Sequence, residues 1–147
     1  MALCVLDAET GEQLHRIETG LPVFSPPAIA DDRLYVGMGT GDYVHTAEDL
    51  GQKPGGAVWC FDLTTMEVLW KSPTGRTVLG AVAVGQGRCY AASRDGVLYQ
   101  IDADNGRLLA TFDARASLIA SPALGERTVY VISEAGTLHG LDIEGLA

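Results

Sequence analysis

The sequence of 147 residues lacks any long uninterrupted hydrophobic run, although 47% of its residues are hydrophobic. A membrane-spanning helix needs about 18 or more consecutive apolar residues. We therefore expect no membrane span, and the apolar side chains must be buried within protein. Basic residues are also scarce, with ten Lys and Arg against 19 Asp and Glu and a formal net charge of −9. Nucleic-acid binding depends on clustered basic residues, so no nucleic-acid partner is expected.

Cysteine is rare as well: Cys4, Cys60 and Cys89 stand far apart in the chain. The sequence contains no CxxC pair, and an odd number of cysteines cannot all pair within one chain. All three lie in apolar, strand-like runs, where a free thiol behaves as a small hydrophobic side chain. We therefore predict three buried free thiols rather than a disulfide framework.

A fixed repeat is the main feature that is present. An apolar strand ending in Asp recurs at positions 7, 62, 102 and 142, with spacings of 55, 40 and 40 residues. A tyrosine inside an apolar strand recurs at Tyr35, Tyr90 and Tyr130, with spacings of 55 and 40. Such a period indicates a repeat architecture. The first unit carries 15 extra residues, which the flanking glycines place at residues 42–55.

Each 40-residue unit contains four short apolar runs separated by turn residues, and no segment shows helical periodicity. Runs such as Val129–Ile132 are apolar on both faces, which suits sheets packed between neighbouring sheets. The predicted fold class is all-β, a partial β-propeller of about three four-stranded antiparallel blades. The whole chain, 1–147, is predicted to be one propeller segment with units at about 3–56, 57–96 and 97–136 and a partial unit at 137–147. The predicted strands are 3–7, 13–18, 22–30, 33–38, 57–62, 67–71, 78–84, 88–93, 97–102, 107–112, 117–123, 128–133 and 137–142.

Equivalent positions of the repeat are expected to be equally buried. One such set lies in the strand that ends in Asp, and the other is the set of strand tyrosines. His15 and His139 also fall at repeat positions and are predicted to be packing residues. The first set consists of Leu6, Phe61, Ile101 and Leu141, and the second of Tyr35, Tyr90 and Tyr130.

The turn after each of these strands carries a family signature. The segment Val5–Glu12 resembles the repeat of pyrroloquinoline-quinone-like propellers, whose usual form is Ala-x-Asp-x-x-Thr-Gly with a Trp eight residues after the Asp. Only the middle unit has a Trp at this position, Trp70, because His15 and Ala110 occupy it in the other units. An Asp carboxylate can accept N–H bonds from the turn after it, and Gly takes the positive φ. We predict a structural role in the turns for Asp7, Gly11, Asp62, Trp70, Asp102, Gly106 and Asp142.

The resemblance favours the quinone-independent branch of this family. Its dehydrogenase members are expected to hold calcium through carboxylate and amide groups and to use a catalytic Asp, an adjacent Cys pair and a flat Trp floor. This chain has no Cys-Cys pair, and its single Asn, Asn105, lies in a repeat turn. We predict no cofactor, no catalytic residue and a non-catalytic binding or scaffold segment. The alternative is the propeller portion of a quinoprotein-like oxidoreductase or of a multidomain enzyme.

Two further motifs resemble ligand sites. Gly37–Gly41 departs from the dinucleotide fingerprint because Asp42 replaces the third glycine. Asp102–Gly106 departs from a calcium loop because its glycine falls one place early. Both segments are better explained as a strand end and a repeat turn.

The insertion at residues 42–55 is the one feature that does not repeat, and loops on a rigid scaffold commonly carry function. Its acidic residues and His45 could hold a metal, and Thr46 with Asp49 could cap one helical turn. Three interpretations stay open: a solvated or packing loop, a ligand or partner contact, and a metal site. We expect the loop to be exposed and mobile. The candidate contact residues are Asp42, Tyr43, His45, Glu48 and Asp49.

The order of the strands predicts uncovered blade faces at both ends of the segment. The first two strands correspond to the third and fourth of one blade, and the last blade lacks its outer strand. Large exposed apolar faces are uncommon in soluble monomers. The expected cover is either the remaining blades of a longer parent, expected to be a bacterial periplasmic or extracytoplasmic protein, or a second copy in a homodimer. In that dimer residues 3–18 of one chain would complete the last sheet of the other. The expected partner is thus a protein, a second copy included, or the remaining blades of the same propeller.

Overall fold

The computed structural model describes residues 1–146, which form 13 strands and no helix. No helix in this part of the chain could therefore span a membrane. The predicted all-β class is confirmed. The strands are β1 (Ala2–Leu6), β2 (Gln13–Glu18), β3 (Ala28–Ala30), β4 (Arg33–Gly39), β5 (Gly56–Asp62), β6 (Val68–Thr74), β7 (Ala83–Gly85), β8 (Arg88–Ala92), β9 (Val97–Asp102), β10 (Leu108–Asp113), β11 (Ala123–Leu124), β12 (Thr128–Ile132) and β13 (Leu138–Asp142).

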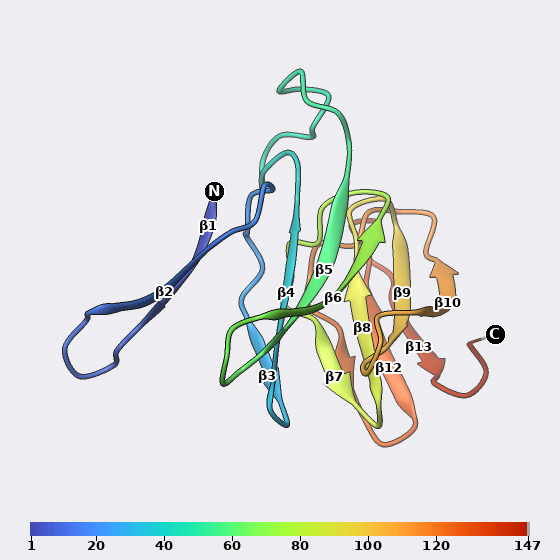
Figure 1. Ribbon diagram of the computed structural model, residues 1–147. Coiled ribbons are helices and arrows are strands. Elements are labelled where there is room, and N and C mark those ends of the chain that lie inside the picture. The colour runs from blue at the N-terminus through green and yellow to red at the C-terminus, as the bar shows by residue number, and fades with distance from the viewer. Residues whose placement is uncertain (147) are drawn as a thin grey trace.

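These strands form four antiparallel sheets, each following the chain order. Blade 1 is β3-β4-β5-β6, blade 2 is β7-β8-β9-β10, and blade 3 is the three-stranded sheet β11-β12-β13. The remaining sheet is the N-terminal hairpin, β1-β2. The first strands of the blades, β3, β7 and β11, are neighbours, so they mark the inner edge of the arc. The predicted partial propeller is confirmed, and Figure 1 shows its blades side by side.

The hydrophobic core lies between the blades. Blade 1 meets blade 2 through a buried cluster that includes Tyr35, Trp70 and Ile101. Blade 2 meets blade 3 through a second cluster that includes Tyr90 and Val129. Both faces of the central sheet are therefore covered, which explains why its strands are apolar on both sides.

The repeat turns show how one unit is tied together. The Asp62 carboxylate accepts the N–H groups of Thr64 and Thr65 at 2.9 and 2.8 Å. These bonds, from Thr65 first, lower the pKa of Asp62. Asp7, Asp102 and Asp142 likewise accept backbone N–H bonds two residues on.

Trp70 extends this turn chemistry to the next blade. Its Nε1–H donates to the carbonyl of Ala103 at 3.0 Å. Its ring lies against Gly106, where an added Cβ would come within 2.7 Å of Trp70 Cδ2. Gly106 also has a φ of +75°, so the turn requires glycine for two reasons.

The prediction that equivalent positions are equally buried is wrong at the two ends of the arc. Leu6 is 58% exposed, whereas Phe61 and Ile101 are fully buried, and Leu141 is half-buried. Tyr130 is 43% exposed, whereas Tyr35 and Tyr90 are at most 2% exposed. The reason is that the outward face of blade 3 and much of the N-terminal hairpin have no neighbouring sheet.

The same cause overturns two further predictions. Cys4 is exposed on the hairpin, although Cys60 and Cys89 are buried free thiols as expected. His15 is also exposed: it lies opposite Val5 in the hairpin and lines the groove between the hairpin and blade 1. His139 is half-buried and does pack, edge-on against Phe112 with ring centroids 5.2 Å apart.

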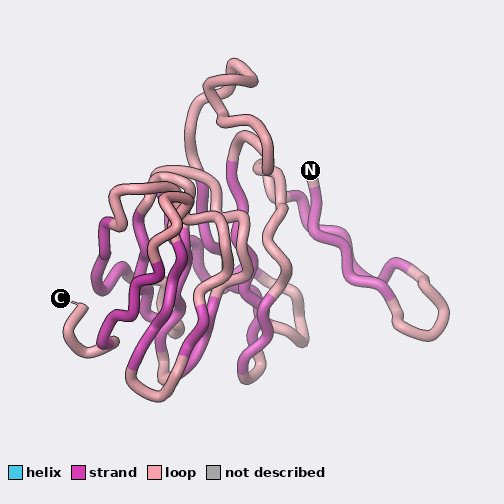
Figure 2. The backbone as a smooth tube through the Cα atoms, turned by 180° about the vertical axis from the view of Figure 1, so that it is seen from behind, coloured by secondary structure: helices cyan, strands magenta, loops and turns pink. Residues whose placement is uncertain are grey.

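Three predicted strands are much shorter than expected. Residues 22–30, 78–84 and 117–123 are paired only over 28–30, 83–85 and 123–124. The earlier part of each run crosses the end of the arc as a loop, drawn in pink in Figure 2. Its apolar residues, such as Val78 and Leu118, are fully buried between blades. A short apolar run cannot distinguish burial in a loop from burial in a strand.

Candidate functional site

The insertion leaves the end of blade 1 between β4 and β5 and projects beyond the other loops (Figure 1). Its base is closed by the Thr40 N–H, which donates to the Gly55 carbonyl at 3.0 Å. The Thr40 hydroxyl donates to the Lys53 carbonyl at 2.9 Å. Gln52 Oε1 then accepts the Gly41 N–H at 2.9 Å. The two ends of the excursion are thus held together where they leave the sheet.

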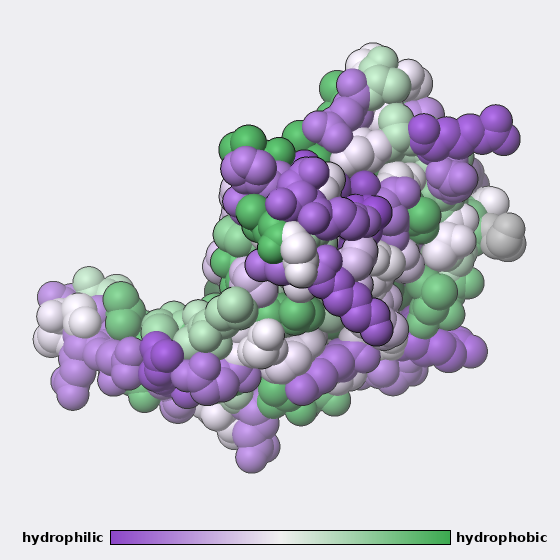
Figure 3. All heavy atoms as spheres, turned by 90° about the horizontal axis from the view of Figure 1, so that it is seen from above, coloured by the Kyte–Doolittle hydropathy of each residue, from purple (hydrophilic) through white to green (hydrophobic). Residues whose placement is uncertain are grey.

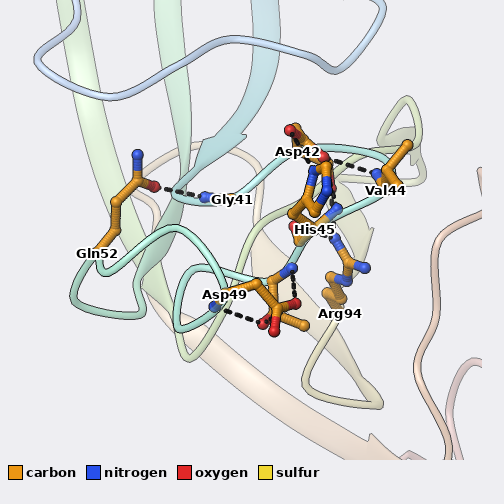
Figure 4. Close-up of polar contacts among 8 residues, drawn as sticks. Gly41, Asp42, Val44, His45, Asp49, Gln52 and Arg94 are labelled. Atoms are coloured by element: carbon orange, nitrogen blue, oxygen red, sulfur yellow. Dashed lines mark hydrogen bonds and ion pairs between the residues drawn. The ribbon is translucent and has the colours of Figure 1, made fainter.

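Two local motifs fold the chain within the loop. Asp42 Oδ1 accepts the N–H groups of Val44 and His45 at 2.7 and 2.6 Å, forming an Asx turn. Thr46 and Asp49 bond reciprocally: Asp49 Oδ2 accepts the Thr46 N–H at 2.8 Å, and Thr46 Oγ1 accepts the Asp49 N–H at 3.2 Å. This is capping-box chemistry. The segment after it is a turn and not a helix. Figure 4 shows both motifs.

Two arginines from outside the loop clamp it onto the arc. Arg94, in the β8–β9 turn of blade 2, donates to the carbonyls of Asp42 and His45, the latter at 2.9 Å. Arg76, in the segment after β6, pairs with both carboxylate oxygens of Glu48. The loop is therefore anchored to the neighbouring blade as well as to its own.

An aromatic contact adds a third anchor. The Tyr43 hydroxyl donates to the Phe24 carbonyl at 2.9 Å, and the two rings meet edge to face with centroids 5.8 Å apart. Tyr43 remains 57% exposed, so one side of its ring is free.

The three carboxylates of the loop are committed to these contacts. The Arg76 side chain lowers the pKa of Glu48, and the hydroxyl of Thr46 lowers the pKa of Asp49. The backbone N–H of His45 lowers the pKa of Asp42. All three groups are ionised at neutral pH, but each faces a different partner.

A metal site would require these groups to converge. His45 Nδ1 lies 3.3 Å from Asp42 Oδ2, and no third ligand joins this pair. In residues 1–146 no group of three or more His, Cys, Asp or Glu side chains is placed to hold a metal ion. The candidate metal ligands therefore lie on one loop but do not form a coordination site.

The loop leaves three apolar side chains exposed among its polar ones. Val44 is 77% exposed and Leu50 is 43% exposed, and like Tyr43 they lie in solvent on a loop whose three carboxylates are engaged. Viewed from above, this end of the molecule shows green apolar residues among purple polar ones (Figure 3). The arrangement can present a fixed apolar contact surface, which we call the loop tip: Tyr43, Val44 and Leu50.

Sequence reasoning missed Arg76 and Arg94. Their equivalents 40 residues later are Ala116 and Glu134, so both arginines are departures from the repeat. A comparison of units would have marked them as partners of the one unit that carries an insertion.

Comparison with known proteins gives a family and a fold. The sequence model described as outer membrane protein assembly factor BamB matches residues 54–146. No curated protein matches the chain.

Three solved structures illustrate the fold. BamB from Moraxella catarrhalis is 16% identical, with a TM-score of 0.71, over 90% of this chain and 38% of that one. The computationally designed Ika4 protein is 18% identical, with a TM-score of 0.75, over 97% of this chain and 79% of that one. The quinohemoprotein alcohol dehydrogenase ADHIIG from Pseudomonas putida HK5 is 20% identical, with a TM-score of 0.61, over 86% of this chain and 20% of that one. This chain thus spans well under half of the natural proteins it resembles.

Proposed function

This chain belongs to the family of the outer membrane protein assembly factor BamB, and we propose that it is a non-catalytic propeller segment that binds a protein partner through its loop tip. The family match confirms the predicted resemblance to pyrroloquinoline-quinone-like propellers. The proposed role of the loop tip rests on the local geometry of the insertion.

The observation that supports the proposal is an exposed apolar surface on an anchored loop. Val44 is 77% exposed although the backbone on either side of it is held by Asp42 and Arg94. A loop fixed before binding loses little conformational freedom when a partner docks. Aromatic side chains are enriched at protein contacts, and exposed apolar patches mark interaction sites.

The candidate residues then divide into two roles. Tyr43 and His45 are exposed enough to touch a partner. Asp42, Glu48 and Asp49 act by shaping the loop, because each carboxylate is already bonded to the chain. The polar groups position the surface, and the apolar groups supply contact area.

We further propose that the parent protein is longer, bacterial and extracytoplasmic. The support is the family name, which places BamB in outer membrane protein assembly, and the partial coverage of the natural relatives. The partner is a protein, and a second copy of the chain is a separate candidate for the open ends of the arc.

The alternative is a propeller portion of a quinoprotein-like oxidoreductase, favoured by the likeness to ADHIIG. Equilibrium dialysis against pyrroloquinoline quinone with calcium separates the two functions. We expect no saturable binding. Saturable uptake of quinone that depends on calcium would support the oxidoreductase instead.

A site-specific photocrosslinker tests the loop tip directly. A benzophenone amino acid replaces Val44 in one variant and Leu108, on the outer strand of blade 2 and 50% exposed, in a matched control. Irradiation in an envelope extract of the source organism should give one adduct from position 44, identified by mass spectrometry, and none from position 108.

The clamp provides the second control. Arg94→Ala combined with Arg76→Ala should weaken the adduct, because the tip is no longer held in place. Identical adducts from positions 44 and 108 would contradict the proposal. So would an adduct from position 44 whose yield is unchanged in the clamp variant.

A further inference from the structure

A cavity of about 440 Å³ lies between blades 1 and 2, beside the closed core of their junction. Its walls come mainly from the β3–β4 turn of blade 1 and from the β7–β8 and β9–β10 turns of blade 2. The first two of these turns lie at the end of the arc opposite the insertion (Figure 1). Both blades have all four strands, so the cavity does not depend on the open ends of the arc. Cavities of this size between packed units are common places for small ligands.

The same place at the next junction is bridged by a side chain. Gln86, in the β7–β8 turn, donates from Nε2 to the carbonyl of Glu126 in blade 3 at 2.6 Å. Asp31 is the repeat equivalent of Gln86 in blade 1, and the two have φ values of +52° and +55°. The Asp31 side chain is one methylene shorter and ends in an acceptor, so it cannot donate to a carbonyl. Within residues 1–146 no side chain donates to the Gln86 carbonyl, the equivalent of the Glu126 carbonyl, so this junction lacks one donor.

The other polar groups of the cavity leave it negatively charged. Arg33 is its one basic residue, and it donates to the Ala103 carbonyl at 2.6 Å and pairs with Asp104 at 2.9 Å. The carboxylates of Asp31 and Asp32 form no hydrogen bond and no ion pair with the described part of the chain. A cleft lined by one sign of charge attracts the opposite charge. The aspartates in the lining are Asp31, Asp32, Asp62 and Asp104.

The remaining lining suits an organic cation better than a metal ion. No three acidic, His or Cys side chains in residues 1–146 are placed to hold a metal. Ala30, Leu69 and Val84 give the cavity an apolar wall, and Leu69 is 46% exposed. A methylene chain can lie along such a wall while its charged end reaches polar groups.

We propose that this cavity binds an aliphatic ammonium group, carried by a small diamine or by a lysine side chain. The ammonium takes the place that the Gln86 amide holds at the next junction and donates to the Asp31 carboxylate and the Gln86 carbonyl. Its methylene chain lies against Leu69 and Val84. An ammonium group supplies three donors and one positive charge, which match the acceptors in the lining. The site is separate from the loop tip and does not rest on its proposed role.

An NMR titration of the 147-residue chain with 1,5-diaminopentane tests the site. We expect saturable shifts confined to the amides of residues 30–33, 84–87 and 103–104. Two matched compounds separate the contributions: 1,5-pentanediol keeps the chain without the charge, and tetramethylammonium keeps the charge without N–H donors. Both should bind at least about tenfold more weakly, because each loses charge-assisted hydrogen bonds.

Asp31→Gln provides the matched variant. It recreates the bridge of the next junction, since its amide can donate to the Gln86 carbonyl, and Gln86 shows that this turn accepts glutamine. Diamine binding should weaken at least about tenfold. Glu134→Gln, an exposed position in the β12–β13 turn, removes the same charge elsewhere and should leave binding unchanged. If Asp31→Gln does not fold, Asp31→Asn removes the charge at the same turn and should weaken binding as well.

A second titration distinguishes the two sources of the ammonium group. Nα-acetyl-lysine methylamide that binds more tightly than the diamine would assign the site to a lysine side chain of a protein, and the reverse order would assign it to a free amine. Shifts that do not saturate would overturn the proposal. Tetramethylammonium that binds as tightly as the diamine, or diamine binding that is unchanged in both Asp31 variants, would do the same.

Discussion

The junction between blades 1 and 2 and the junction between the N-terminal hairpin and blade 1 use the same repeat positions with opposite results. At the first, Trp70 is 8% exposed, donates to the Ala103 carbonyl and covers Gly106. At the second, the equivalent residue is His15, which is exposed. The first junction is closed and the second remains open along its groove.

This contrast shows that a repeat residue acquires its role from the sheet beside it. The junction between blades 2 and 3 supports this view, because it closes without a tryptophan. There Gln100 and Arg88 both donate to the Ile143 carbonyl, at 3.0 and 3.2 Å, and Ile143 is buried. The hairpin contributes only two strands to its junction with blade 1, and two-stranded sheets are marginally stable by themselves.

Thiol labelling should show the largest contrast between the two regions. In dilute solution Cys4 on the hairpin should react rapidly with a thiol reagent. Cys60 and Cys89 in the closed junction should react only when the protein unfolds. Burial raises the pKa of Cys60 to about 11 and that of Cys89 further. Protection of the two buried thiols should reach about 10³-fold or more. Three thiols that react at one rate without denaturant would show that the two junctions do not differ.

Trp70→Ala should produce the largest change in stability. It removes a nearly buried indole and its hydrogen bond to Ala103, so we expect a loss of about 3–5 kcal/mol in the free energy of unfolding, measured by urea denaturation. The matched control, His15→Ala at the same repeat position, should cost no more than about 0.5 kcal/mol. Equal losses would show that the hairpin junction is as closed as its neighbour.

Gly106→Ala and Gly11→Ala form a second matched pair. The two glycines have φ values of +75° and +73°, so the backbone strain on a side chain is the same. That strain is about 1–2 kcal/mol. A Cβ at Gly106 would also meet the Trp70 ring at 2.7 Å, whereas at Gly11 nothing lies within 4 Å. Thermal unfolding should therefore show the larger loss for Gly106→Ala, and a Trp70→Ala background should remove the excess.

The smallest effect concerns the clamped loop under acid conditions. Arg76 holds the pKa of Glu48 below its ordinary value of 4.5. A carboxyl group with a lowered pKa in the folded state contributes stability above its unfolded pKa and loses it as the pH falls through the folded pKa. The protection factors of amides 46–50, measured by NMR and corrected for the intrinsic pH dependence of exchange, should fall below about pH 4.5 before the blades unfold. Glu48→Gln should show the faster exchange already at neutral pH, and an unchanged rate in that variant would mean that Arg76 does not hold the loop.

Much of the fold could be predicted from the sequence because the repeat is local and periodic. The recurrence of Asp62 and Asp102 with Tyr35 and Tyr90 located the strands and the insertion. The exposure of Leu6 and Tyr130 could not be predicted from the repeat. The repeat implies a neighbouring sheet beside every unit, but neither residue has one. Equivalence of sequence position is a property of the chain, whereas burial is a property of the neighbours.

The candidate site was predicted less completely. The insertion and its capping pair, Thr46 and Asp49, follow from local sequence. Arg94 lies 49 residues from His45, whose carbonyl it binds, and nothing local links them. The acidic residues suggested a metal site because the sequence shows how many there are. It does not show that each carboxylate is bonded to another group of the chain.

Hydrogen exchange of the unsubstituted 147-residue chain would test the contrast between closed and open junctions. It is followed by mass spectrometry at a concentration low enough to keep the chain monomeric. Closed junctions on both sides of blade 2 predict that amides of β8 and β9 exchange slowest, those of blade 1 nearly as slowly, and those of β1, β2 and β13 fastest. Protection of the hairpin in the monomer equal to that of β8 and β9 would contradict an open hairpin junction.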